Sequence, residues 1–198
     1  MARWTPGARE RLIGSAFELF QEQGYAATTV PEIAARAGVT NRTFFRYFGD
    51  KREVLFGNEE QIAAELRDAL AQVPAELSTA DFVAAGIELM ARRLDGRRDE
   101  LRLLRKIIES DDGLRERSLG KRRAQGVILG DALRERGLGP AQARLLAEAT
   151  VSALYIALEQ WHERDDDTGV DVLTFEALAG LGTELHEITA ARQLPAHH

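Results

Sequence analysis

The chain contains no cysteine, and this absence excludes several kinds of chemistry at once. Without thiols there is no disulfide framework, no thiolate metal site and no cysteine nucleophile. Proline is scarce, at 5 of 198 residues, and alternating β-branched residues are nearly absent. The sequence therefore favours helices over strands.

Long apolar runs and metal-ligand spacings are missing as well. No run approaches the roughly 20 residues that span a bilayer, and "MARWTPGARE" has no apolar core after its charges, unlike a secretory signal. The four histidines lack zinc-ligand spacing, and there is no phosphate-binding glycine loop and no G-x-S-x-G. We therefore expect a cytoplasmic protein that contacts no membrane, needs no cofactor or metal and is not an enzyme.

The net charge of −6 is unevenly distributed. Residues 1–52 contain 8 Lys and Arg against 5 Asp and Glu, a balance of +3, which leaves −9 for the remainder. Such asymmetry indicates a nucleic-acid-binding portion, here at the N-terminus.

Helical spacing recurs from end to end and predicts an all-α fold. A three-helix N-terminal domain is expected over residues 1–52, followed by a connector helix and a C-terminal helical bundle over residues 53–198. The connector is predicted to run unbroken from Lys51 to Val73, before Pro74. The bundle helices are predicted near Ala80–Leu94, Asp99–Ser110, Leu114–Arg136, Pro140–Glu163 and Val172–Ala191.

Residues 28–51 have the pattern of a helix-turn-helix. Thr29 and Glu32 form a capping box, with Pro31 in the first turn of the helix that it opens. That helix is predicted to end at Gly38, and Thr40 caps the next one, which runs to Gly49. Asp50 to Glu53 forms another capping box at the start of the connector.

The second of these helices has the chemistry of a major-groove reader. Phe44, Phe45 and Phe48 are predicted to anchor it to a small core. The opposite face and the exposed N-terminal end carry Asn41, Arg42, Thr43, Arg46 and Tyr47. Arginine pairs with the guanine edge, asparagine with adenine, and the threonine methyl contacts thymine. The alternative is an ordinary solvated helix face, which the coincidence of caps, glycine turn and aromatic anchors disfavours.

The run "GYAATTVPEIAARAGVTNRTFFRYFGDKREVL", residues 24–55, resembles the DNA-binding domain of the tetracycline-repressor (TetR) family of transcriptional regulators. The resemblance implies a homodimer on a palindromic operator, released by a small-molecule effector that binds the C-terminal domain. By position it assigns phosphate contacts to Thr28, Thr29, Thr40, Tyr47 and Lys51. It assigns base contacts to Asn41, Arg42, Thr43 and Arg46.

Two positions depart from the family pattern. Arg42 stands where the family often has a small residue, which points to an individual sequence preference. Phe45 replaces the usual tyrosine and is expected only to pack.

The last two helices carry more apolar surface than one bundle needs. Residues 143–161 are apolar nearly all round, and the final helix has a stripe of Leu178, Leu181, Leu185 and Ile188. A monomeric core and a dimer interface explain this equally well from periodicity, and the family resemblance favours the dimer. Candidate pocket residues are Phe82, Met90, Ile108 and Tyr155, although such residues more often belong to a core.

Three functions fit the sequence to different degrees. The first is a dimeric, ligand-responsive regulator bound to double-stranded DNA, acting as a repressor. The second is an all-α enzyme, for which no catalytic constellation is present. The third is a helical interaction module or small-molecule-binding protein without DNA regulation, against which Thr40, Arg42, Arg46 and Lys51 argue.

Overall fold

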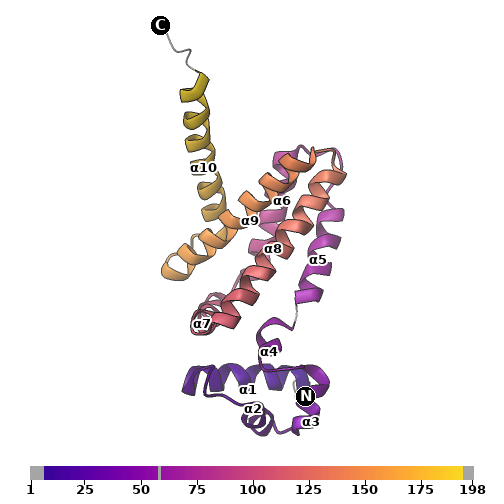
Figure 1. Ribbon diagram of the computed structural model, residues 1–198, viewed down its shortest axis with the longest axis vertical. Coiled ribbons are helices and arrows are strands. Elements are labelled where there is room, and N and C mark those ends of the chain that lie inside the picture. Colours follow the sequence, from indigo (N-terminus) through magenta and orange to yellow (C-terminus); the bar gives the residue numbers. More distant parts are fainter. Residues whose placement is uncertain (1–6, 58, 194–198) are drawn as a thin grey trace. The chain divides into compact units, whose positions relative to one another are not determined.

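The computed structural model describes residues 7–57 and 59–193, and every regular element in these ranges is an α-helix. The predicted all-α fold is therefore confirmed. The predicted bundle helices are found within two residues of their expected ends (Figure 1). The first helix begins at Ala8.

The chain forms two compact units. The first contains the described residues up to 62 together with residues 99–121, and the second contains residues 63–98 and the described residues from 122 onward. The placement of the end of the DNA-binding part at residue 52 stays a prediction.

The first unit is built around three short helices, α1 (Ala8–Gln23), α2 (Val30–Arg36) and α3 (Asn41–Tyr47). α2 packs against both α1 and α3 (Figure 1). Their common core also receives α4 (Glu53–Phe56), α7 (Arg98–Glu109) and the first turn of α8 (Asp112–Glu135). Its fully buried large side chains include Leu12, Ile33, Phe44 and Leu114.

The predicted unbroken connector helix is wrong. α4 ends at Phe56, Gly57 is its C-cap, and α5 (Glu59–Ala71) is a separate helix. Phe56 packs into the core of the first unit, whereas Leu66 and Leu70 of α5 pack into the core of the second. The two stretches serve different cores, and glycine is a poor helix former at the point between them.

The second unit is a bundle of α5, α6 (Thr79–Leu94), the remainder of α8, and α9 (Pro140–Glu163) (Figure 1). Its core includes Phe82, Ile87 and Leu133, and α8 approaches α9 closely at Gly130, where an added Cβ would lie 3.7 Å from the Cβ of Ala147. No helix within the described ranges is long and apolar enough to cross a membrane.

Two arginines hold the loops of this unit in the same way. The Arg136 guanidinium lies 4.4 Å from the ring centroid of Phe82 and donates to the carbonyl oxygens of Pro74 and Leu77, each at 2.9 Å. The Arg98 guanidinium lies 4.5 Å from the Trp161 ring centroid and donates to the carbonyl oxygen of Asp166 at 2.8 Å. Both cations combine ring stacking with charge-assisted hydrogen bonds.

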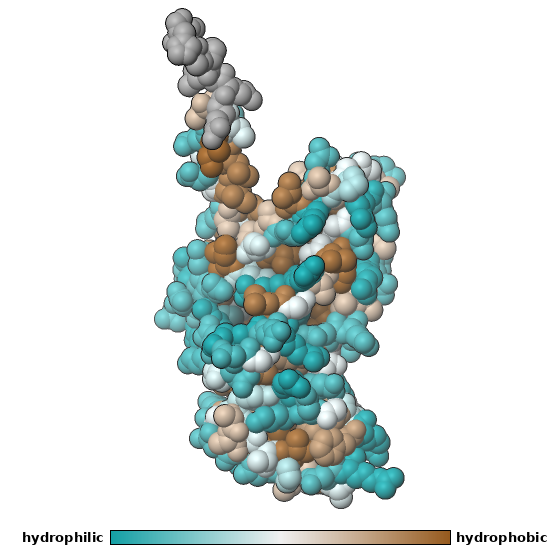
Figure 2. All heavy atoms as spheres, viewed as in Figure 1, coloured by the Kyte–Doolittle hydropathy of each residue, from teal (hydrophilic) through white to brown (hydrophobic). Residues whose placement is uncertain are grey.

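The last helix, α10 (Val170–Gln193), is buried only in its first half. Leu173 and Thr174 are buried against the unit, whereas the side chains of residues 179–191 are all exposed. Figure 1 shows this second half extending away from α9, and Figure 2 shows apolar residues along it. The predicted apolar stripe is present and largely uncovered.

Candidate DNA-binding site

The N-terminus of α2 is fixed by the predicted capping box, which the structure confirms. The Glu32 carboxylate accepts hydrogen bonds from the Thr29 backbone N–H at 2.8 Å and from the Thr29 hydroxyl at 2.7 Å. The Thr29 Oγ1 in turn accepts from the Glu32 backbone N–H at 3.4 Å. These bonds lower the pKa of Glu32, because they stabilise its ionised form. Pro31 lies in the first turn, as predicted.

A tight turn joins α2 to α3 and places the second helix. Gly38 has φ +68°, a left-handed conformation that favours glycine, and the N–H of Val39 donates back to the carbonyl of Ala34 at 2.9 Å. Thr40 then caps α3 as predicted, since its Oγ1 accepts from the Thr43 N–H at 3.2 Å. The sequence thus dictates where α3 begins.

Two aromatic side chains anchor α3, and the third does not. Phe44 and Phe48 are buried, at 0% and 2% exposure, one turn apart on the same side. The predicted anchoring of Phe45 is wrong, because its side chain is 55% exposed and meets Phe44 only edge-on. A seven-residue helix has room for one buried stripe, and Phe45 lies about 100° round the helix from Phe44.

The remaining face of α3 is accessible. Asn41, Arg42, Arg46 and Tyr47 are exposed, and Thr43 is half-buried. Arg46 lies over the ring of Tyr47, with its guanidinium carbon 4.9 Å from the centroid, and donates to the Tyr47 hydroxyl at 3.2 Å. Within the described part of the chain, no hydrogen bond or ion pair holds the Arg42 guanidinium. The structure therefore presents a free guanidinium on a helix whose own orientation is fixed by its core.

Lys51 and Thr28 take part in the architecture of this unit. The Lys51 ammonium donates to the carbonyl oxygens of Tyr25 at 2.6 Å and Thr28 at 2.9 Å, and it lies 4.2 Å from the centroid of the Tyr25 ring. Burial lowers the pKa of Lys51 and raises the pKa of Tyr25 to about 12. Thr28 is buried, at 1% exposure, and its hydroxyl donates to the carbonyl of Gly24 at 2.8 Å.

Lys51 therefore ties the turn before α2 to the segment after α3. We expect Lys51→Met, which keeps the apolar stem and removes the ammonium, to destabilise the chain by about 1–3 kcal/mol, because carbonyls that accepted charged hydrogen bonds lose their donor. Arg52→Met is the control. Arg52 is 53% exposed and pairs with Asp50 at the surface, so the loss there should be below about 1 kcal/mol. Equal urea-unfolding free energies for the two variants would contradict this role of Lys51.

The predicted pocket residues are only partly brought together. Met90 lines a small apolar cavity of about 40 Å³ between α5, α6, α8 and α9. The Tyr155 hydroxyl donates to the Oε1 of Gln125, which lines the same cavity, at 3.0 Å. Phe82 lies in the core of this unit but does not line the cavity, and Ile108 packs against the core of the first unit. Among the described side chains no group of His, Asp or Glu is placed to hold a metal ion.

Comparison with known proteins agrees with this geometry. Residues 12–57 match the model of the bacterial regulatory proteins, tetR family. The HTH-type transcriptional regulator HbdR of Aromatoleum sp. (strain CIB) is 46% identical over 48 residues, which are 24% of this chain and 21% of HbdR. The match to this relative thus spans about a fifth of its length.

Similar solved structures extend over both units. The crystal structure of Thermus thermophilus FadR, a TetR-family transcriptional repressor in complex with lauroyl-CoA, superposes with a TM-score of 0.60 and 23% identity, over 86% of this chain and 91% of FadR. The SmeT–triclosan complex gives a TM-score of 0.61 and 22% identity, over 87% of this chain and 90% of SmeT, the repressor of the Stenotrophomonas maltophilia efflux pump SmeDEF. At these identities the likeness concerns the fold.

The fold and the site together define a helix-turn-helix protein with a C-terminal helical domain. Residues 12–57 form a domain of the bacterial regulatory proteins of the tetR family, and the chain shares the fold of solved TetR-family regulators over most of its length.

Proposed function

We propose that this chain is a homodimeric transcriptional repressor that binds a palindromic operator through the Thr40–Phe48 segment and is released by an apolar small molecule. The observation that carries the proposal is the exposed polar face of α3, with the unpaired Arg42 guanidinium, on a helix anchored by the buried Phe44 and Phe48. Rigid presentation of a bidentate donor suits a base edge in the major groove.

The proposed DNA contacts come from the exposed and half-buried groups of this unit. Base edges are read by Asn41, Arg42, Thr43 and Arg46. Phosphates are held by Thr29, Thr40, Tyr47 and Lys51, which fix the register of the helix on the duplex. We leave Thr28 out of this set, because its buried hydroxyl already donates to the carbonyl of Gly24.

The homodimer is proposed to form through α9 and α10. Leu181, Leu185 and Ile188 are 43%, 51% and 61% exposed, which is unusual for three large apolar residues on one stripe. Leu145 and Ile156 of α9 are also exposed, at 68% and 48%. A two-fold pairing covers both surfaces at once and places two reading helices on one duplex.

The effector site is proposed at the apolar cavity beside Met90. Its lining is apolar except for Gln125 and Thr150, so it suits an apolar group. Its volume of about 40 Å³ is far below the roughly 300–1,000 Å³ of a drug-sized pocket, so a ligand must separate the helices to enter. The ligand then binds the bundle with separated helices more tightly than the closed bundle. Such a difference in affinity is required if the ligand is to shift the protein to an arrangement that releases DNA. Lauroyl-CoA and triclosan, found with FadR and SmeT, both have large apolar parts.

A ligand screen tests the effector assignment. We expect medium-chain acyl thioesters and chlorinated aromatic compounds to raise the unfolding temperature of the protein and to lower its operator affinity. Leu129→Trp, which fills the cavity, should abolish the temperature shift and keep operator binding. Compounds that stabilise the protein but leave operator affinity unchanged at saturation would rule out induction through this cavity.

A further inference from the structure

An apolar side chain lies on the polar face of α3. The Phe45 ring is 55% exposed, whereas the other phenylalanines of the first unit are buried or half-buried. Because successive residues of an α-helix are about 100° apart, Phe45 lies about 40° round the helix from Asn41 and about 60° from Arg42. A single exposed apolar residue is common on protein surfaces. Here it adjoins two residues that are proposed to read bases, so a duplex held by them would also meet the phenyl ring.

The Phe45 ring is held by the core of its unit. It meets the ring of Phe44 edge-on, with the centroids 5.5 Å apart and the planes at 81°, and Phe44 is fully buried. Edge-to-face contact is a favoured arrangement of aromatic rings. The core therefore orients the Phe45 side chain as well as the backbone of α3, and the outward part of the ring is open to a partner.

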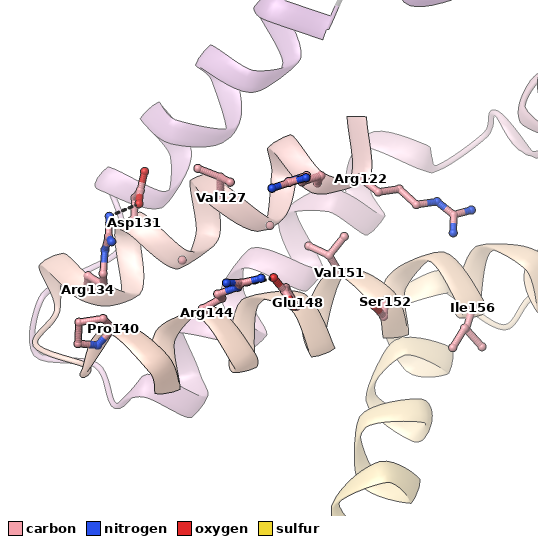
Figure 3. Close-up of a pocket in the computed structure, with 13 residues that line it drawn as sticks. Arg122, Val127, Asp131, Arg134, Pro140, Arg144, Glu148, Val151, Ser152 and Ile156 are labelled. Atoms are coloured by element: carbon pink, nitrogen blue, oxygen red, sulfur yellow. Dashed lines mark hydrogen bonds and ion pairs between the residues drawn. The ribbon is translucent and has the colours of Figure 1, made fainter. Parts of the chain in front are cut away.

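The surface round Phe45 is basic, and no acid on the same helix compensates it. α3 contains Arg42 and Arg46 and no acidic residue. The open groove between α8 and α9 is the contrasting case (Figure 3). Three of its four arginines pair with acids: Arg134 with Asp131, Arg144 with Glu148 and Arg122 with Glu159. Uncompensated cations beside an exposed ring favour a polyanion that has apolar groups of its own, as the DNA duplex has.

The chemistry of the ring decides which part of a duplex it contacts. A phosphate oxygen accepts from a donor, and phenylalanine has none, unlike Tyr47 or the tyrosine that is usual at position 45. Base edges in the major groove present hydrogen-bonding groups, except for the C5-methyl group of thymine. We propose that Phe45 reads this methyl group, close to the base contacted by Arg42. The assignment rests on the proposed binding of an operator through α3 and adds an apolar determinant to its sequence preference.

Deoxyuridine tests this assignment, because it pairs with adenine as thymine does and lacks only the methyl group. An operator is first selected with the parent chain from a random duplex library, and each thymine is then replaced in turn, in both half-sites. We expect replacement at one position per half-site to lower the affinity of the parent roughly threefold to tenfold. Phe45→Ala protein should bind the thymine and deoxyuridine operators alike. Its unfolding temperature should stay close to that of the parent, because the side chain is exposed.

Leu119→Ala is the matched control. Leu119 is an apolar residue of the same unit, on α8, with a similar exposure of 61%. Its loss should leave both the operator affinity and the deoxyuridine effect unchanged. Thr43→Ser is a second comparison, because Thr43 carries the one methyl group of α3. This variant should keep the deoxyuridine effect at the position assigned to Phe45.

The outcomes separate this assignment from the proposed function. A deoxyuridine effect that persisted in full in Phe45→Ala protein would overturn the assignment, and its loss in Thr43→Ser would transfer the methyl contact to Thr43. No effect at any thymine would also overturn it. If Phe45→Ala then weakened binding to all sequences alike, the ring would contact deoxyribose, which is the same at every base pair. Failure of the parent chain to select any operator would overturn the proposed function itself.

Discussion

The double variant Leu181→Asp/Leu185→Asp is expected to sediment as a monomer and to lose operator affinity by roughly 1,000-fold or more, down to non-specific binding. Both leucines lie exposed on the stripe of α10, where a dimer would bury them. Two carboxylates on that stripe would have to lose their hydration without a counter-charge at each position, which costs several kcal/mol per interface. A monomer presents one reading helix and loses the contacts of the second half-site.

The matched control places the same two charges on the other side of the same helix. Thr183 and Ala190 are exposed and lie off the stripe, seven residues apart. Thr183→Asp/Ala190→Asp should remain dimeric and bind the operator as the parent does. If both double variants lost the dimer equally, the effect would come from the net charge of α10 rather than from the stripe. A Leu181→Asp/Leu185→Asp protein that stayed dimeric would remove this helix from the interface.

The second large effect is expected at Arg42. Arg42→Ala should weaken operator binding by about 1–3 kcal/mol and relax the base preference at one position in each half-site. Its guanidinium has no partner among the described residues, so its removal breaks no contact within the fold. The unfolding temperature should therefore stay close to that of the parent.

Arg92→Ala provides the comparison for Arg42. Arg92 is a similarly exposed arginine on α6, where it pairs with Glu88 one turn away. Its loss should change neither affinity nor base preference. Binding measured on every single-base variant of the selected operator separates the two cases. If Arg42→Ala weakened binding to all variants alike, Arg42 would be a phosphate contact rather than a base reader.

Much of the candidate site follows from local sequence. The capping box at Thr29 and Glu32, the Thr40 cap and the glycine turn depend on residues within five positions of one another, and all three are present. The helix bounds of the bundle could be predicted for the same reason, because caps and breakers act over a single turn. The exposed stripe of α10 was also visible as a repeat.

Features that depend on distant residues could not be predicted. The Lys51 ammonium meets carbonyls more than twenty residues earlier, and no local pattern records that contact. The break after Phe56 arises because α4 and α5 pack into different cores, which periodicity does not distinguish. The sequence pattern predicts an anchor at Phe45, but α3 is too short to bury a second aromatic row.

The central claim is that two copies of α3 read one two-fold operator. The most direct test selects bound sequences from a random duplex library and then applies hydroxyl-radical footprinting to the most enriched sequence. We predict an inverted repeat with half-site centres about 34–36 Å or more apart, protected symmetrically, which Arg42→Ala protein enriches with one base position in each half-site relaxed. Enrichment of a single unrepeated site, or no enrichment by the parent chain, would contradict the account.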